Sequence, residues 1–446
     1  MSRHARPSNS APVKAGQFHS PSLRKTPLAG AGWDRGFESL SPGHPVQPHG
    51  AFSDLRGVSQ LIVAAVAGVT TIVEEMHRNI ARISPPVGIA PSGRARGVSG
   101  LVYRSVRGVT RLVGFSLDTA LAPLTPLLIH HAPSPRREAL LAALNGVLGD
   151  YLVAAQNPLA IPMRLRQEGY PLEPDQPAFA ARFAGSSGKL LVLVHGLCMN
   201  DLEWQREGHD HGAALAEDLG YTPLYLHYNS GQHISINGRE FAALLERLVQ
   251  VWPVPVSELV LIGHSMGGLV SRSACYYAKQ ADYQWLGHLQ KLICLGTPHH
   301  GAPLERVGHR ANMIAGISPY TAPLTRLGKI RSAGVQDLRY GNILDEDWQR
   351  HGSEHLQDPR RQAPLPENAH CFVIAATRQP PFDNPGARLP GDGLVPLQSA
   401  LGQHEQAALN LPIPASRQAI CYGLNHFDLL SSREVYARIR RWVAQD

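Results

Sequence analysis

Residues 263–267 read Gly-His-Ser-Met-Gly and stand between the apolar segment 259–262 and a stretch of helical periodicity. A Gly-x-Ser-x-Gly run between a strand and a helix is typical of a nucleophile elbow, a tight turn that exposes the serine hydroxyl at the sheet edge. The turn ends at a helix N-terminus, where the helix dipole favours developing negative charge. The pattern predicts that Ser265 is a nucleophile for acyl transfer.

A serine nucleophile needs a histidine as general base and an acid that holds this histidine in one tautomer. Among 22 histidines, His426 stands in Asn-His-Phe-Asp-Leu-Leu, after an apolar segment and before the last helical stretch. Asp392 stands in Pro-Gly-Asp-Gly-Leu-Val-Pro, whose glycines suit a tight loop, and Asp383 is the alternative acid. The order Ser265, Asp392, His426 is the order expected of the α/β-hydrolase arrangement.

The oxyanion of an acyl-transfer intermediate needs two backbone N–H donors. One donor would be Met266, directly after the nucleophile. The second should follow the apolar segment 190–194, at Leu197 or Cys198, and Leu197 is our candidate. His195 begins this loop, and we interpret it as structural rather than catalytic. Cys198 could line the pocket, but no neighbour in the sequence favours a thiolate.

Short apolar segments alternate with helical stretches from about residue 160 onward, which indicates a parallel α/β sheet. We therefore expect one α/β catalytic domain over residues 161–446. The predicted strands are 190–194, 223–227, 259–262, 292–295, 371–375 and 418–422, and the predicted helices are 212–219, 238–251, 267–279 and 432–443. Residues 302–369 interrupt the alternation and are longer than a crossover needs, which predicts an inserted cap.

These motifs give residues from about 185 to 446 a resemblance to α/β-hydrolases of the lipase and esterase group. Residues 295–303, Leu-Gly-Thr-Pro-His-His-Gly-Ala-Pro, resemble a run typical of lipases and of GPI inositol-deacylase-like and lecithin:cholesterol acyltransferase-like hydrolases. The resemblance implies an α/β-hydrolase fold and hydrolysis of a carboxylic ester, often of a lipid or acyl chain. It also implies that the segment from Thr297 borders the acyl pocket. The candidate substrate contacts are His195, Cys198, His264, Thr297 and His299.

The N-terminal part of the chain differs from the rest in charge and pattern. Residues 1–131 hold 14 Lys and Arg against 6 Asp and Glu. Residues 1–50 lack periodicity and are predicted to be a disordered basic tail. Residues 51–160 are predicted to be a helical extension, in which Arg-Gly-Val-Ser at 56–59 recurs at 96–99. Within this extension, residues 51–131 either pack on the main domain or meet an anionic membrane surface, and no nucleic-acid signature accompanies them.

Composition and cysteine usage narrow the class of protein further. The sequence has no run of about 18 strongly apolar residues, so we expect no transmembrane helix. Five scattered cysteines favour a reducing compartment, and we expect a cytoplasmic protein, either free or peripheral at a membrane. His209-Asp-His211 lacks a third ligand, so we predict no metal, and the triad needs no cofactor.

Three functions stay open from the sequence. The first is a serine hydrolase of a small-molecule or lipid-like ester. The second is an acyltransferase that uses the same triad with an alcohol as acceptor. The third is a non-catalytic, membrane-associated binding protein on a hydrolase fold. The sequence does not indicate an oligomeric state.

Overall fold

A computed structural model describes residues 57, 135–174, 177–302, 332–349, 363–381 and 390–445. The predicted tail, the repeated motif apart from Gly57, and most of the predicted cap lie outside the described residues. The alternative acid Asp383 lies outside them as well.

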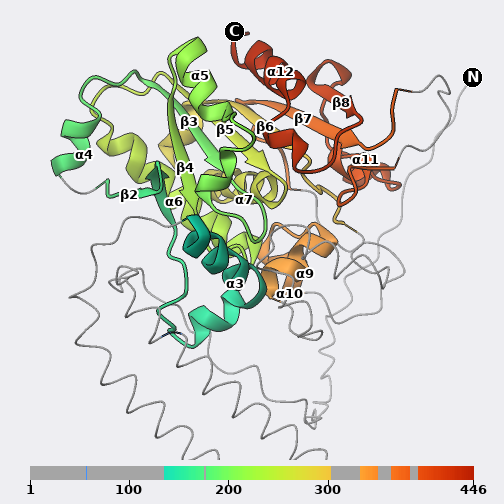
Figure 1. The fold of residues 1–446 in the computed structure, drawn as a ribbon, viewed down its shortest axis with the longest axis horizontal. Coiled ribbons are helices and arrows are strands. Elements are labelled where there is room, and N and C mark those ends of the chain that lie inside the picture. The colour runs from blue at the N-terminus through green and yellow to red at the C-terminus, as the bar shows by residue number, and fades with distance from the viewer. Residues whose placement is uncertain are drawn as a thin grey trace, which may run out of the picture. The chain divides into compact units, whose positions relative to one another are not determined.

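The described residues contain an eight-stranded sheet in the order β2-β1-β4-β3-β5-β6-β7-β8 (Figure 1). Strands β3 to β8 pair in parallel with their neighbours, whereas β1 pairs antiparallel with both β2 and β4. The sheet is therefore mostly parallel, as predicted. The strands are β1 (Arg164–Gln167), β2 (Tyr170–Leu172), β3 (Lys189–Val194), β4 (Thr222–His227), β5 (Glu258–His264), β6 (Leu289–Leu295), β7 (His370–Thr377) and β8 (Gln418–Tyr422).

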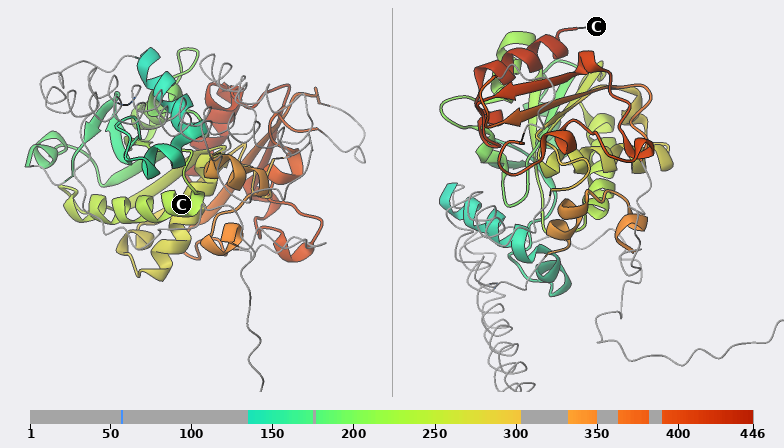
Figure 2. Two further views of the ribbon diagram at one scale, coloured as in Figure 1. Left: turned by 90° about the horizontal axis from the view of Figure 1, so that it is seen from below. Right: turned by 90° about the vertical axis from the view of Figure 1, so that its right-hand side faces the viewer.

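Helices cover both faces of the sheet, as three directions of view show (Figures 1 and 2). On one face Leu190 and Val192 of β3 belong to one core with α6 and α7. On the other face Leu191 and Leu193 belong to a second core with α5 and α12. Alternate side chains of one strand thus enter two cores, which is why the strands read as continuous apolar runs. The helices are α5 (His211–Leu219), α6 (Ile234–Val251), α7 (Met266–Gln280) and α12 (Arg433–Val443).

All six strands and four helices predicted for residues 161–446 are present, with ends shifted by four residues or fewer. The sequence analysis missed β1 and β2, because Arg-Leu-Arg-Gln and Tyr-Pro-Leu are short and carry polar residues or proline. It also missed four short helices, namely α4 (Pro177–Arg182), α9 (Ala333–Tyr340), α10 (Asp345–Gln349) and α11 (Leu397–Ala400). Among the described helices, each is too short or too polar to cross a bilayer.

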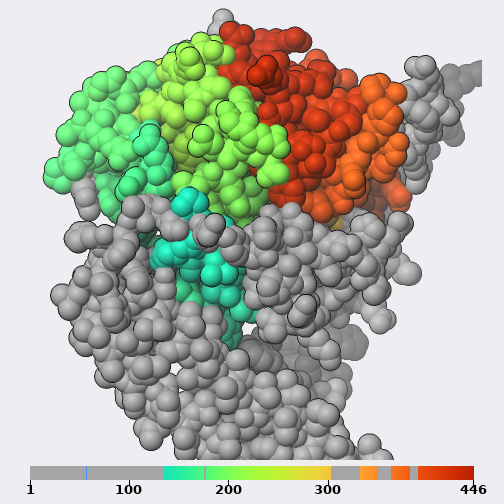
Figure 3. Space-filling model, in the orientation of Figure 1, coloured from blue at the N-terminus to red at the C-terminus, as the bar shows by residue number. Residues whose placement is uncertain are grey.

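Helix α3 (Pro135–Ala154) is the part of the predicted N-terminal extension that the structure describes in full. In the space-filling view α3, in teal, lies directly against green segments of the sheet domain (Figure 3). Asn229, which follows β4, donates a hydrogen bond to the carbonyl of Gly149 in α3. After the helix, the Asn157 amide donates to the carbonyl of Gly57 at 3.0 Å. Helix α3 therefore packs on the sheet domain through specific polar contacts.

Candidate active site

The nucleophile candidate lies at a strained turn between β5 and α7. Ser265 follows the last residue of β5 and caps α7, with φ of 54° and ψ of −122°. A Cβ added at Gly267 would lie 2.0 Å from the carbonyl oxygen of Val194, so only glycine fits there. A left-handed, non-glycine residue costs of order 1–3 kcal/mol and persists only where its surroundings enforce it. The predicted elbow geometry is present.

The predicted base and acid form a direct pair. His426 Nδ1 donates to Asp392 Oδ2 at 2.7 Å, and both residues are buried. The other carboxylate oxygen of Asp392 accepts the backbone N–H groups of Leu394 and Val395, at 2.9 and 2.8 Å. These bonds fix the carboxylate, and a proton held on Nδ1 leaves Nε2 of His426 able to accept one.

Ser265 and His426 line the same pocket, which is otherwise mainly apolar. Leu197 from the loop after β3 and Leu338 from α9 enclose it. The remaining lining residues are Met199, His264, Pro298, Ala302, Leu394, Val395 and Phe427. A mainly apolar wall with a few polar groups at one point is what a pocket for an acyl or other hydrocarbon group requires.

The structure separates the two alternatives for the second oxyanion donor. The backbone N–H of Cys198 donates to Ser230 Oγ at 3.0 Å and is therefore occupied. Leu197 lines the pocket beside Ser265, which makes its N–H the better placed of the two. Met266 is the first residue of α7, where backbone N–H groups have no partner within the helix. The two candidate donors thus come from the loop after β3 and from the helix after β5.

His264 contacts the loop that carries the base. Its Nε2 bonds to the backbone carbonyl of His426 at 3.1 Å, and because a carbonyl only accepts, Nε2 carries the proton. Burial, with a further contribution from His426, lowers the pKa of His264 well below 6.5. His264 is therefore a neutral donor that ties the elbow to the base loop, in addition to lining the pocket.

Two other predicted substrate contacts, His195 and Cys198, belong to the oxyanion loop but are not in the lining of this pocket. The ring of His195 stacks on Tyr228 with centroids 4.4 Å apart, and burial lowers its pKa to about 3. The Cys198 thiol lies 3.9 Å from the carbonyl of Ala143 in α3, and burial raises its pKa to about 12. Both side chains are neutral and enclosed by protein.

Thr297 and His299 also lie outside the lining of this pocket. Thr297 is fully buried, and a Cβ at Gly268 would lie 2.1 Å from its hydroxyl oxygen. Arg272 of α7 donates to His299 Nδ1 at 3.2 Å. Burial, and then Arg272, lowers the pKa of His299 well below 6.5. The segment that begins at Thr297 therefore contributes Pro298 and Ala302, rather than its polar residues, to the pocket.

The histidine pair considered as a metal site has another arrangement. His209 Nε2 and His211 Nδ1 are hydrogen-bonded to each other at 2.8 Å, and His211 Nε2 donates to the carbonyl of Leu429. Within the described ranges, no three His, Cys, Asp or Glu side chains come together to hold a metal ion.

Sequence reasoning missed a buried ion cluster beside the site, formed by Glu138, Arg166, Asp201 and His227. Its members come from α3, β1, the 3₁₀ helix η2 (Asp201–Trp204) and the end of β4. The nearest of them in sequence are 26 residues apart. No local pattern marks such a cluster, because its residues meet only once the sheet and α3 are assembled.

A serine elbow after β5, an acid after β7 and a histidine after β8, on a mostly parallel sheet, define an α/β-hydrolase fold. Residues 186–356 match a family model described as the PGAP1-like alpha/beta domain. The fold implied by the sequence resemblance is therefore confirmed.

Solved structures similar to this chain include bacterial and archaeal lipases and esterases. The mature lipase BlEst2 of Bacillus licheniformis is 19% identical with a TM-score of 0.39, over 63% of this chain and 98% of the lipase. An esterase of Pyrococcus furiosus is 15% identical with a TM-score of 0.36, over 58% and 82%. The naproxen esterase of Bacillus subtilis is 12% identical with a TM-score of 0.33, over 57% and 83%. Among curated proteins, none matches the sequence.

Proposed function

We propose that the protein is a serine-dependent carboxylic ester hydrolase that acts on an ester with an apolar acyl group. One observation carries this proposal. His426 is hydrogen-bonded to a buried, fixed Asp392 and lines the same pocket as Ser265 at the elbow. This is the constellation that converts a serine hydroxyl into a nucleophile at neutral pH.

The reaction has two steps. His426 Nε2 takes the proton of Ser265 as the oxygen attacks the ester carbonyl, and the carbonyl oxygen becomes an oxyanion facing the N–H groups of Leu197 and Met266. His426 then donates the proton to the leaving alcohol, which produces an acyl-Ser265 ester. In the second step His426 takes a proton from water, hydroxide adds to the acyl carbon, and the acid leaves as Ser265 regains its proton.

The pocket walls support an apolar substrate group. Leu338, Leu394 and Val395 face the pocket, together with Phe427 beside the base. Burying each methylene of an acyl chain against such a wall contributes about 0.8 kcal/mol of binding, until the chain outgrows the pocket. We therefore expect activity to increase with chain length up to an optimum.

The test is hydrolysis of a series of p-nitrophenyl esters from acetate to palmitate. The comparison is between wild type, Ser265→Ala and, as matched control, Ser273→Ala, which truncates another buried serine of α7. We expect Ser265→Ala to lose at least 10³-fold in kcat, and Ser273→Ala to keep wild-type kcat per folded molecule. Full activity in Ser265→Ala would overturn the proposal. Ester formation that dominates over hydrolysis when an alcohol is added would replace it with acyl transfer.

A further inference from the structure

We propose that α3 is a positioning element for the oxyanion side of the site, acting on the loop 195–200 through Glu138 and Gly146. This inference rests on the proposed function, because it concerns the Leu197 N–H as an oxyanion donor. It extends that function by giving a role in the reaction to a helix outside the catalytic sequence motifs.

The loop that carries Leu197 needs support from outside. It joins the end of β3 to Asp201, the first residue of η2. Cys198, next to Leu197, has φ of 58°, a left-handed conformation that a cysteine does not adopt without constraint. A donor N–H contributes to catalysis only if its direction is set before the oxyanion forms. The surroundings of Cys198 and Asp201 therefore decide whether the Leu197 N–H is aimed correctly.

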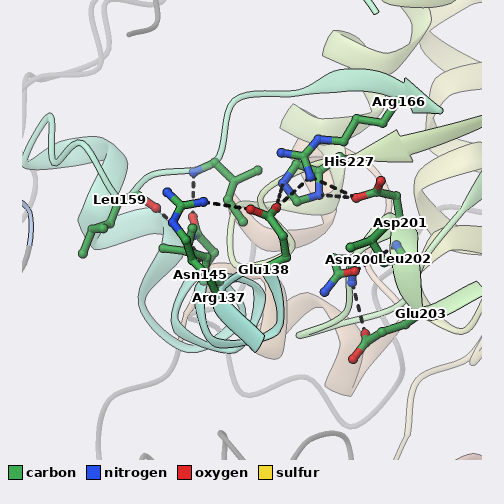
Figure 4. Close-up of polar contacts among 12 residues, drawn as sticks. Arg137, Glu138, Asn145, Leu159, Arg166, Asn200, Asp201, Leu202, Glu203 and His227 are labelled. Atoms are coloured by element: carbon green, nitrogen blue, oxygen red, sulfur yellow. Dashed lines mark hydrogen bonds and ion pairs between the residues drawn. The ribbon is translucent and has the colours of Figure 1, made fainter. Parts of the chain in front are cut away.

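The first support is the buried ion cluster at the far end of the loop (Figure 4). Arg166 Nη1 donates to Glu138 Oε2 at 2.7 Å and to Asp201 Oδ1 at 3.2 Å, so one guanidinium joins α3 to the start of η2. His227 Nδ1 lies 3.1 Å from the same oxygen of Asp201. Arg137 donates to the other oxygen of Glu138 at 2.8 Å.

Together with Arg137, the charges of this cluster balance. Burial, with Arg166 as the next cause, lowers the pKa of His227, which leaves His227 neutral between two arginines and two carboxylates. Removing one partner of such a set leaves a buried charge without its counter-charge. This destabilises the fold far more than the loss of an exposed ion pair does. Asp201 is thus held by Arg166 of β1, and Glu138 of α3 in turn holds Arg166.

The second support is a direct backbone contact. Gly146 of α3 lies so close to Cys198 that an added Cβ would be 2.2 Å from its Sγ and 2.9 Å from both its Cα and its N. The backbone of α3 at Gly146 therefore contacts the residue next to Leu197 directly. Only glycine permits so close an approach. The two supports act at both ends of the segment from Cys198 to Asp201.

The C-terminal half of the helix is in turn anchored to α9. Ser332 Oγ, at the start of α9, donates to the carbonyl of Gly146 at 2.6 Å. The carboxylate of Asp150 accepts the N–H of Ala333 at 2.9 Å. Because α9 also supplies Leu338 to the pocket, α3 connects the oxyanion loop to a pocket wall. A shift of α3 would therefore move both.

The experiment compares Gly146→Ala with Gly188→Ala. Gly188 directly precedes β3 at its other end, and a Cβ there would lie 2.3 Å from the carbonyl oxygen of Pro255. Both variants add a methyl group that would lie too close to protein backbone. Only the methyl group of Gly146→Ala would contact the oxyanion loop. The readouts are kcat and KM for a p-nitrophenyl ester, normalised to folded protein, and the inhibition constant of an alkyl trifluoromethyl ketone.

The ketone reports on the oxyanion donors directly. Ser265 Oγ adds to its carbonyl carbon, the proton passes to His426, and the carbonyl oxygen becomes an oxyanion in the position of the transition state. We expect Gly146→Ala to lose about 10–100-fold in kcat with KM changed less than about threefold, because losing a whole donor costs about 10²–10³. Ketone affinity should fall by the same factor. Gly188→Ala should keep wild-type kcat and ketone affinity.

Glu138→Gln tests the same inference through the ion cluster. If Gly146→Ala does not fold, the inference is judged on Glu138→Gln alone. We expect its kcat and ketone affinity to fall together, by about tenfold, with KM unchanged. Folded variants with wild-type kcat and ketone affinity would overturn the inference and leave α3 a purely structural helix. Failure of the proposed function itself would give a different result: folded wild-type protein would neither hydrolyse esters nor bind the ketone.

Discussion

Ser265 and Cys198 share a left-handed backbone, with φ of 54° and 58°, but different parts of the chain hold them there. Ser265 is held by its immediate neighbours, since β5 ends directly before it and α7 begins directly after it. Cys198 is held from a distance, by Gly146 of α3 and by Ser230 after β4. The strand, turn and helix that carry the nucleophile are therefore continuous in the sequence, whereas the oxyanion loop is supported by elements distant in the sequence.

The two sides of the site should therefore respond differently to substitution. A local turn depends on a few residues that have no substitute, such as Gly267. A loop supported from several elements can lose one contact and still fold, but the direction of its N–H groups then changes. We therefore expect substitutions on the nucleophile side to remove activity or folding outright, and substitutions on the oxyanion side to lower kcat in steps.

The largest effect is expected at the acid of the nucleophile side. Asp392→Asn should reduce kcat by about 10³–10⁴-fold, because an amide that donates to Nδ1 would force the proton onto Nε2 and leave no base for Ser265. The measurement is kcat for a p-nitrophenyl ester. Asp210→Asn is the control, since Asp210 caps α5 and asparagine caps equally well. A loss below tenfold in Asp392→Asn would contradict the assigned triad.

The next effect tests how rigid the elbow is. Gly267→Ala places a Cβ against the Val194 carbonyl oxygen and should lower the free energy of unfolding by about 3 kcal/mol or prevent folding. Gly287→Ala meets no atom within 4 Å and should change it by less than about 0.5 kcal/mol. Urea unfolding of both variants measures the difference. Equal stability of the two would show that the elbow is not tightly packed.

The sequence predicts the two sides of the site unequally. Gly-His-Ser-Met-Gly after an apolar strand was enough to place Ser265, and Asp392 and His426 followed from their loop contexts and their order. The parallel sheet followed from the alternation of apolar and helical segments. The antiparallel β1 and β2, and the cluster of Glu138, Arg166, Asp201 and His227, left no local pattern, since their stabilising partners are far away in the sequence.

Acid should weaken the oxyanion side through His195. Its pKa is lowered to about 3 in the folded protein, against 6.5 as its ordinary value, so the unfolded chain binds an extra proton at intermediate pH. The contribution of His195 to the free energy of unfolding is complete above pH 6.5. It falls by about 1.4 kcal/mol per pH unit towards pH 3. Urea unfolding from pH 7.5 to 5 should show a smaller loss in His195→Asn than in wild type. Identical slopes would contradict a buried, neutral His195.

The smallest effect is expected at Cys198. Cys198→Gly relieves a left-handed conformation that costs about 1–2 kcal/mol, but it loses the buried thiol and raises the entropy of the unfolded chain by a similar amount. The free energy of unfolding should therefore change by less than about 1 kcal/mol, and kcat by less than about threefold. Thermal and kinetic assays measure both quantities. A loss of 2 kcal/mol or more would show that the thiol, rather than the backbone contact with Gly146, holds the loop.

The central claim is that Ser265 is an activated nucleophile, and its most direct test is labelling of the folded protein with a fluorophosphonate probe. Mass spectrometry of the digested product then locates the adduct. We expect one adduct per molecule, on the peptide that contains Ser265, and no adduct in Ser265→Ala. An adduct on a different serine, or a folded wild-type protein that takes no label, would contradict the account.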